Sequence, residues 1–131
     1  MAGDFYYTKS DSVVSTLALS LKRMTEQEFH TLADQALEEL SDRLAKAGEL
    51  HGFESDFNSG ALTIEFDEPP AKFVVSPNTP VRQIWISALS RSFKLDWDAT
   101  RAAFVLAASG ETMVEFLGGA ISSQLGETVA L

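Results

Sequence analysis

The sequence predicts an α+β fold: a two-layer sandwich in which two helices pack on one face of an antiparallel sheet of five or more strands. Near the start and the end of the chain, apolar residues recur every three or four positions, which is typical of amphipathic helices. Between these segments the apolar period changes to two, which is typical of strands with one buried face. The order helix, strands, helix favours both helices on the same face of the sheet.

The first helix is predicted to begin at Thr25 and to end at Gly48. Thr25 and Glu28 have the spacing of a capping box, and glycine often follows the last turn of a helix. Acidic residues four positions apart line the side opposite the apolar stripe, because a helix advances about 100° per residue. The acidic row is Asp34, Glu38 and Asp42, and the apolar stripe is Phe29, Leu32, Ala33, Ala36, Leu37, Leu40 and Leu44.

The middle of the chain alternates between apolar and polar residues. After the first helix, Glu54 and Asp56 are predicted to point away from Phe53 and Phe57, because successive strand side chains lie on opposite faces. Strands are predicted at 53–57, 62–66, around 73–75, at 81–87, before Trp97 and at 102–107, with a tight turn at 76–80.

Trp85 is predicted to lie on an exposed face of the sheet. In the strand Val81–Ser87, Ile84 and Ile86 share one face, whereas Gln83 and Trp85 share the other. If the isoleucines face the core, Trp85 faces outward, and an exposed tryptophan often anchors a partner. The alternative is that Trp85 packs against another strand or a loop.

A second capping box, Thr112 with Glu115, predicts the start of the closing helix. The segment Ser109–Thr112 has features of an anion-binding helix start, but a plain helix cap is the simpler interpretation. Gly118 and Gly119 each cost about 1 kcal/mol relative to alanine inside a helix, which predicts close approach to a neighbouring element. The buried side is predicted to comprise Val114, Phe116, Leu117, Ala120, Ile121 and Leu125.

Length and composition indicate one globular domain of 131 residues, 45% hydrophobic and 22% charged. We assign residues 24–131 to this domain and residues 1–23 to an N-terminal extension of uncertain role. The extension lacks the basic flank and cleavage site of a secretory signal. It is a native extension, a remnant of processing or vector sequence. Leu17, Leu19 and Leu21 in it can pack on the domain or form a short strand.

Charge and residue usage exclude several classes of function. The net charge of −9 repels phosphate backbones and attracts cations or basic protein patches, so we expect no nucleic-acid partner. The chain has no cysteine, which excludes disulfides, thiolate metal sites and a thiol nucleophile. No apolar run approaches the roughly 20 residues that span a bilayer, so we expect a soluble protein with no membrane partner.

Carboxylates are the candidate chemical groups of this chain. They form the helix row Asp34, Glu38 and Asp42, and a hairpin set of Glu54, Asp56, Glu65, Asp67 and Glu68. Carboxylate oxygens suit hydrated divalent cations and iron that keeps its water, so a site here would be exposed, weak and poorly selective. The alternative is an acidic face that is simply solvated. Catalytic motifs are absent: we find no Ser-His-Asp set, phosphate loop or paired-histidine motif.

The order and spacing of several short segments resemble the frataxin family, whose bacterial branch is the CyaY proteins. The resemblance extends from residue 24 to residue 131. The segments that carry it are Glu28-Phe29-His30, Leu32-Ala33-Asp34-Gln35, Gly60–Phe66, Thr79-Pro80, Gln83-Ile84-Trp85, Asp96-Trp97 and Ser109–Thr112. The family fold is the sandwich that the residue pattern predicts.

The resemblance implies an iron-binding accessory protein of iron–sulfur cluster assembly that docks on the cysteine desulfurase–scaffold complex. It implies weak binding of Fe²⁺ or Fe³⁺ at the surface, on one acidic ridge that the helix row and the hairpin set form together, and near the start of the first helix. The implied metal ligands are Glu26, His30, Asp34, Glu38, Asp42, Glu54 and Asp56, and the implied partner-binding residues are Asn78, Thr79, Gln83 and Trp85.

Other functions remain open within this resemblance. One is a ferroxidase or iron-storage oligomer that oxidises ferrous iron at clustered carboxylates, which would be the only enzymatic activity we expect. Another is an adaptor that binds proteins without metal. We expect a monomer, with an iron-dependent oligomer as the alternative, and a cytoplasmic location for a bacterial chain or the mitochondrial matrix for a eukaryotic one.

Overall fold

A computed structural model describes residues 24–131, and the expectations for residues 1–23 lie outside this range. The elements in chain order are α3 (Glu26–His51), β3 (Glu54–Asn58), β4 (Ala61–Asp67), β5 (Pro70–Asn78), the 3-10 turn η1 (Thr79–Val81), β6 (Gln83–Ala88), β7 (Arg91–Asp98), β8 (Ala103–Leu106), β9 (Glu111–Thr112) and α4 (Met113–Leu125). The strands form one seven-stranded sheet in the order β3 to β9, and every neighbouring pair is antiparallel.

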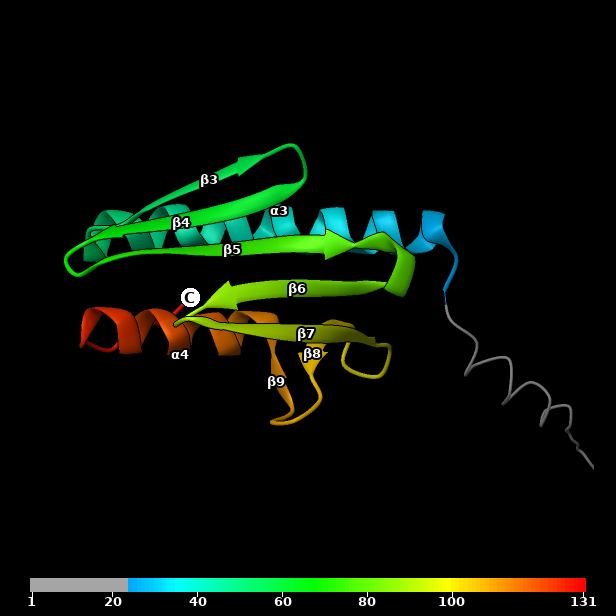
Figure 1. Ribbon diagram of the computed structural model, residues 1–131. Coiled ribbons are helices and arrows are strands. Elements are labelled where there is room, and N and C mark those ends of the chain that lie inside the picture. Colours follow the sequence, from blue (N-terminus) through cyan, green and yellow to red (C-terminus); the bar gives the residue numbers. More distant parts are fainter. Residues whose placement is uncertain (1–23) are drawn as a thin grey trace, which may run out of the picture.

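Helices α3 and α4 lie behind the same face of the sheet, whose other face is turned to the viewer in Figure 1. The predicted α+β sandwich is therefore confirmed. The sheet runs in chain order because each strand returns beside the previous one through a short connection. No helix within residues 24–131 is long and apolar enough to cross a membrane.

Helix α3 begins as predicted and ends later than predicted. The Thr25 hydroxyl accepts from the Glu28 N–H and the Glu28 carboxylate accepts from the Thr25 N–H, at 3.1 and 2.8 Å. The predicted end at Gly48 is wrong, because α3 continues to His51 and Gly52 ends it in the left-handed conformation. Gly48 serves a different purpose: a Cβ there would lie 2.5 Å from the Phe53 carbonyl oxygen, so only glycine lets the chain return this closely.

The turn predicted at residues 76–80 lies later in the chain, because β5 continues through Asn78 and the turn begins at Thr79. The last three residues of β5 pair with β6, and Ser76 lies opposite Trp85. Proline has no backbone N–H, so it is tolerated in a strand where no neighbouring strand needs that donor. Pro77 stays within β5, beyond the residues of β5 that pair with β4. The turn is made by η1 and by Arg82 with a φ of 55°, so β6 begins at Gln83 and not at Val81.

The remaining strand boundaries differ from the prediction by one or two residues. Strand β7 extends one residue past Trp97, to Asp98. Strand β8 starts at Ala103, because Ala102 has a φ of 51° that is incompatible with a strand. Strand β9 was not predicted, because two residues are too few to show an alternation.

The hydrophobic core fills the space between the sheet and the two helices. The rings of Trp97 and Phe104 meet edge to face with centroids 5.1 Å apart. Phe104 also meets Phe29 of α3 at 6.0 Å, which joins the far strands to the first helix. The largest fully buried side chains are Phe29, Phe73, Phe104, Leu37, Leu40, Leu44, Leu62, Ile64, Ile84, Ile86, Leu95 and Leu117.

Helix α4 has the predicted capping box. Of its predicted buried residues, Leu117, Ala120 and Ile121 are buried, and Val114, Phe116 and Leu125 are half-buried. The close approach predicted for the glycine pair holds for Gly118, where a Cβ would lie 3.5 Å from the Val129 carbonyl oxygen. It is wrong for Gly119, where nothing lies within 4 Å of a Cβ because that position faces outward.

The C-terminal segment after α4 packs back on both helices. The Ser122 hydroxyl accepts from the Val129 N–H at 2.9 Å, and Val129 is 5% exposed. The Arg43 guanidinium donates to the Leu131 carbonyl at 2.9 Å. His51 is the last residue of α3 and contacts Glu127 at 2.6 Å.

Candidate functional site

The face of the sheet opposite the helices carries polar side chains because of the strand alternation. In β6, Ile84 and Ile86 are buried on the helix side, whereas Gln83 and Trp85 point to the open side. The expectation that Trp85 faces outward is borne out by its 38% exposure. The open side is therefore available to a partner from β3 across to β7 (Figure 1).

A connected group of side chains, here called the tryptophan patch, lies at the centre of the open face and comprises Asn78, Gln83, Trp85, Lys94 and Asp96. The register places Asn78 and Asp96 on either side of Gln83, and Lys94 opposite Trp85. The Trp85 indole N–H donates to the Gln83 oxygen at 2.9 Å, and the Gln83 amide N–H donates to Asp96 at 3.1 Å. The Lys94 ammonium lies over the Trp85 ring, 5.0 Å from its centroid.

Sequence reasoning predicted only part of this patch. It named Asn78, Gln83 and Trp85, which the structure brings together, and Thr79, which begins the η1 turn beside Asn78. It missed Lys94 and Asp96. The register of the β6–β7 hairpin would have found both, because each lies directly across from a residue already named.

The acidic ridge consists of Asp34, Glu38 and Asp42 on α3 and Glu54 and Asp56 on β3. All of these residues are exposed. The helix acids lie opposite the buried stripe of α3, and the strand acids lie on the open face of the sheet. Because α3 packs against β3, the helix acids and the strand acids lie on neighbouring elements.

The strand part of the ridge borders a shallow hollow of about 300 Å³ on the open face. Glu54 lies opposite Glu65, and Glu65 lies opposite Lys72, so an ammonium group sits beside the paired carboxylates. The lining residues are Glu54, Ser55, Asp56, Thr63, Glu65 and Lys72. Lys72 lowers the negative potential there, which weakens this end of the ridge as a cation site.

Metal-ligating side chains are spread out over the described part of the chain. Within residues 24–131, no group of three or more histidine, cysteine, aspartate or glutamate residues lies close enough together to hold a metal ion. His30 and Glu26 are exposed in the first turns of α3. The arrangement can attract cations through its field, but it does not form a closed coordination cage.

Comparison with known proteins shows the family to which this chain belongs. Residues 22–127 match the model of the frataxin-like domain. The chain belongs to the frataxin family. It is 30% identical over 108 residues to the iron-sulfur cluster assembly protein CyaY of Thioalkalivibrio sulfidiphilus (strain HL-EbGR7), covering 82% of this chain and 100% of that protein.

Two solved frataxin structures are similar to the present one. The frataxin from Psychromonas ingrahamii has a TM-score of 0.70 and 29% sequence identity, with 82% of this chain and 97% of that chain covered. The trimeric frataxin from the yeast Saccharomyces cerevisiae has a TM-score of 0.61 and 21% identity, with 94% and 98% covered, and shows likeness of fold alone.

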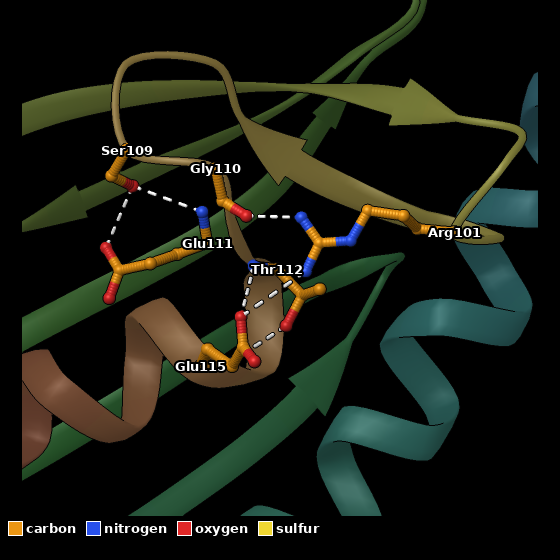
Figure 2. Close-up of polar contacts among 6 residues, drawn as sticks. All are labelled: Arg101, Ser109, Gly110, Glu111, Thr112 and Glu115. Atoms are coloured by element: carbon orange, nitrogen blue, oxygen red, sulfur yellow. Dashed lines mark hydrogen bonds and ion pairs between the residues drawn. The ribbon is translucent and has the colours of Figure 1, made fainter.

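One polar cluster of this frataxin-family chain holds the start of α4 against the turn after β7. Figure 2 shows Arg101 reaching from the turn after β7 to the Gly110 carbonyl oxygen and to the Glu115 carboxylate, 3.7 Å away. The Thr112 N–H donates to Glu115 at 3.0 Å, and the Glu115 N–H donates back at 3.2 Å. The helix-cap interpretation of residues Ser109–Thr112 is therefore confirmed.

Proposed function

We propose that this chain is an accessory protein of iron–sulfur cluster assembly that docks on a complex of cysteine desulfurase and scaffold protein. The name of the Thioalkalivibrio relative, an iron-sulfur cluster assembly protein, supports this role. The observation that carries the proposal is the combination of an outward Trp85 on an uncovered sheet face with exposed acids on α3 and on the edge strand β3. The bacterial source of the relative supports a cytoplasmic location.

The two surfaces have different tasks in this proposal. The acidic ridge, on a chain of net charge −9, meets a basic patch of the desulfurase and increases the rate and orientation of encounter more than the affinity. The tryptophan patch contacts the scaffold protein, with Asn78, Thr79, Gln83 and Trp85 at the contact. A large aromatic side chain at the centre of such a contact commonly carries much of its binding energy.

Iron has a secondary place in the proposal. The residues that would hold it are those of the ridge together with the first turns of α3, namely Glu26, His30, Asp34, Glu38, Asp42, Glu54 and Asp56. Their oxygen donors suit Fe²⁺ or Fe³⁺, and the lack of a closed group within residues 24–131 means that bound iron keeps most of its water. The same observation favours a second candidate function, an adaptor that binds the complex without metal.

The test compares two double variants that remove the same charge from different places. Glu38→Gln with Asp42→Asn neutralises part of the ridge, whereas Glu39→Gln with Glu111→Gln neutralises acids outside it. We expect the ridge variant to lower the association rate with a bacterial desulfurase–scaffold complex about tenfold at low salt, and the control variant to lower it less than twofold, because steering depends on where the charge lies. Equal losses in the two variants would overturn the docking role of the ridge.

A titration with ferrous iron under anaerobic conditions, followed by amide NMR, separates the two candidates. Broadening of the Asp34, Glu38 and Glu54 signals by iron, and again by the complex, supports the iron-binding accessory protein. No change with iron, together with changes at Gln83 and Trp85 on adding the complex, supports the adaptor. Rapid oxygen consumption that needs Glu38 and Asp42 would contradict both and indicate a ferroxidase.

A further inference from the structure

Three side chains of the tryptophan patch, those of Trp85, Gln83 and Asp96, form a chain of hydrogen bonds that crosses from β6 to β7. Gln83 and Asp96 lie directly opposite each other in the register, and Trp85 lies two residues further along β6 on the same face. Gln83 accepts from the Trp85 indole and donates to the Asp96 carboxylate. Each member therefore fixes the direction of the next.

The chemistry of the two end groups allows only one orientation of the Gln83 amide. An indole N–H can only donate a hydrogen bond, and a carboxylate can only accept one. If the amide were turned over, its NH₂ would face the indole N–H and its oxygen would face the Asp96 oxygen. Asp96 thus sets the direction of the Gln83 amide, and through it the direction of the Trp85 indole edge.

This arrangement determines which part of Trp85 is offered to a partner. The indole N–H is already used within the protein, and part of one ring face is covered by Lys94. Trp85 as a whole is 38% exposed. Beside it, Gln83 keeps one unused N–H, since only one of its two hydrogens points to Asp96.

We infer that Asp96 is a positioning residue of the tryptophan patch: it holds the Gln83 amide so that Trp85 meets its partner with the ring and not with the indole N–H. The inference rests on the proposed docking function. Side chains that are ordered before contact lose less conformational freedom on binding, so they bind more tightly. Asp96 itself is exposed and does not belong to the hydrophobic core, so its contribution falls on binding and not on folding.

The first measurement needs only the free protein. The chain has two tryptophans, so an NMR spectrum has two indole N–H signals, and Trp97 serves as the internal reference. We expect Asp96→Ala to shift and broaden the Trp85 signal and to leave the Trp97 signal in place. Asp96→Asn should restore it, because the amide oxygen still accepts from Gln83. An unmoved Trp85 signal in Asp96→Ala would overturn the inference.

Exchanging the amide of Gln83 and the carboxylate of Asp96 between the two positions provides a second check. Gln83→Glu places two carboxylates opposite each other, so the Trp85 signal should move as it does in Asp96→Ala. Adding Asp96→Asn to that variant should restore the signal, because the new amide donates to the new carboxylate while the indole keeps an acceptor. If this double variant does not restore the signal, hydrogen bonding does not set the orientation of the Trp85 indole, which contradicts the inference.

The second measurement is the affinity for the desulfurase–scaffold complex. We expect Asp96→Ala to weaken binding by about 3- to 10-fold, the loss typical of one or two side chains that must be ordered on contact, and Asp96→Asn to bind within twofold of the unmodified chain. Equal losses in both variants would overturn the positioning role and assign the effect to charge. Unchanged binding by Trp85→Ala would instead overturn the proposed docking function of this face, whatever Asp96 does.

Discussion

Alternate residues of strand β6 belong to two different regions of the molecule, the core and the open face. Ile84 and Ile86 are 0% and 1% exposed and belong to the core beneath the helices, whereas Trp85 between them is 38% exposed and belongs to a polar network. One backbone therefore supplies stability on one face and recognition on the other. Because the two roles fall on opposite faces, they can be changed independently.

The largest effect on the free energy of unfolding is expected from replacing one side chain of β6 by alanine on the buried face and, separately, one on the open face. Ile86→Ala leaves a cavity in the core and should lower the free energy of unfolding by about 2–5 kcal/mol. Trp85→Ala, its neighbour on the open face, should cost less than about 1 kcal/mol, because it removes partly exposed contacts. Urea unfolding followed by circular dichroism gives both values. A loss of equal size in Trp85→Ala would mean that the open face is as important for folding as the core.

A smaller effect on the free energy of unfolding is expected at Gly48, where the end of α3 lies against the chain that enters the edge strand β3. Gly48→Ala places a Cβ 2.5 Å from the Phe53 carbonyl oxygen, so the chain between α3 and β3 must shift. We expect a loss of about 1–3 kcal/mol in the free energy of unfolding, as for other overpacked sites. Ala45→Gly, at an exposed position of the same helix, measures helix propensity alone and should cost about 1 kcal/mol.

The sign of the Gly48→Ala effect is informative. Helix propensity alone would make the alanine variant more stable than the natural chain. A gain in stability would therefore show that α3 and β3 can separate slightly at no cost, and that the covered face is less tightly packed at its edge than at Ile86.

The sequence predicted several features that depend on local pattern. The alternation of Ile84, Trp85 and Ile86 was sufficient to assign both faces of β6, and the spacing of Thr25 and Glu28 was sufficient to place the start of α3. These features depend on residues a few positions apart, which a single sequence displays directly.

Features that depend on distant pairing could not be predicted in this way. Gly48 has the sequence pattern of a helix end, and only the return of Phe53 shows that it is a buried contact. Asp96 becomes part of the tryptophan patch only through the β6–β7 register. The ridge acids were correctly expected to be exposed, but their separation depends on how α3 lies along β3, and their role as metal ligands stays a prediction.

The smallest effect on the free energy of unfolding is expected at two glycines, Gly119 inside α4 and Gly126 at its C-cap. A Cβ at either position would meet nothing within 4 Å. Gly119 lies inside the helix and is exposed, whereas Gly126 ends the helix with a φ of 71°. Gly119→Ala should raise the free energy of unfolding by about 0.5–1 kcal/mol, because alanine restricts the unfolded chain and favours the helix.

Gly126→Ala should lower the free energy of unfolding by about 1 kcal/mol, because a left-handed backbone crowds a Cβ against its own carbonyl group. Space around the side chain is equally open at both positions, so the difference in sign isolates backbone conformation from packing. The same urea unfolding measurement checks both variants. If both variants were more stable than the natural chain, α4 would not need a left-handed residue at its C-terminal end. The segment that leads to Val129 would then follow α4 with a different backbone conformation at residue 126.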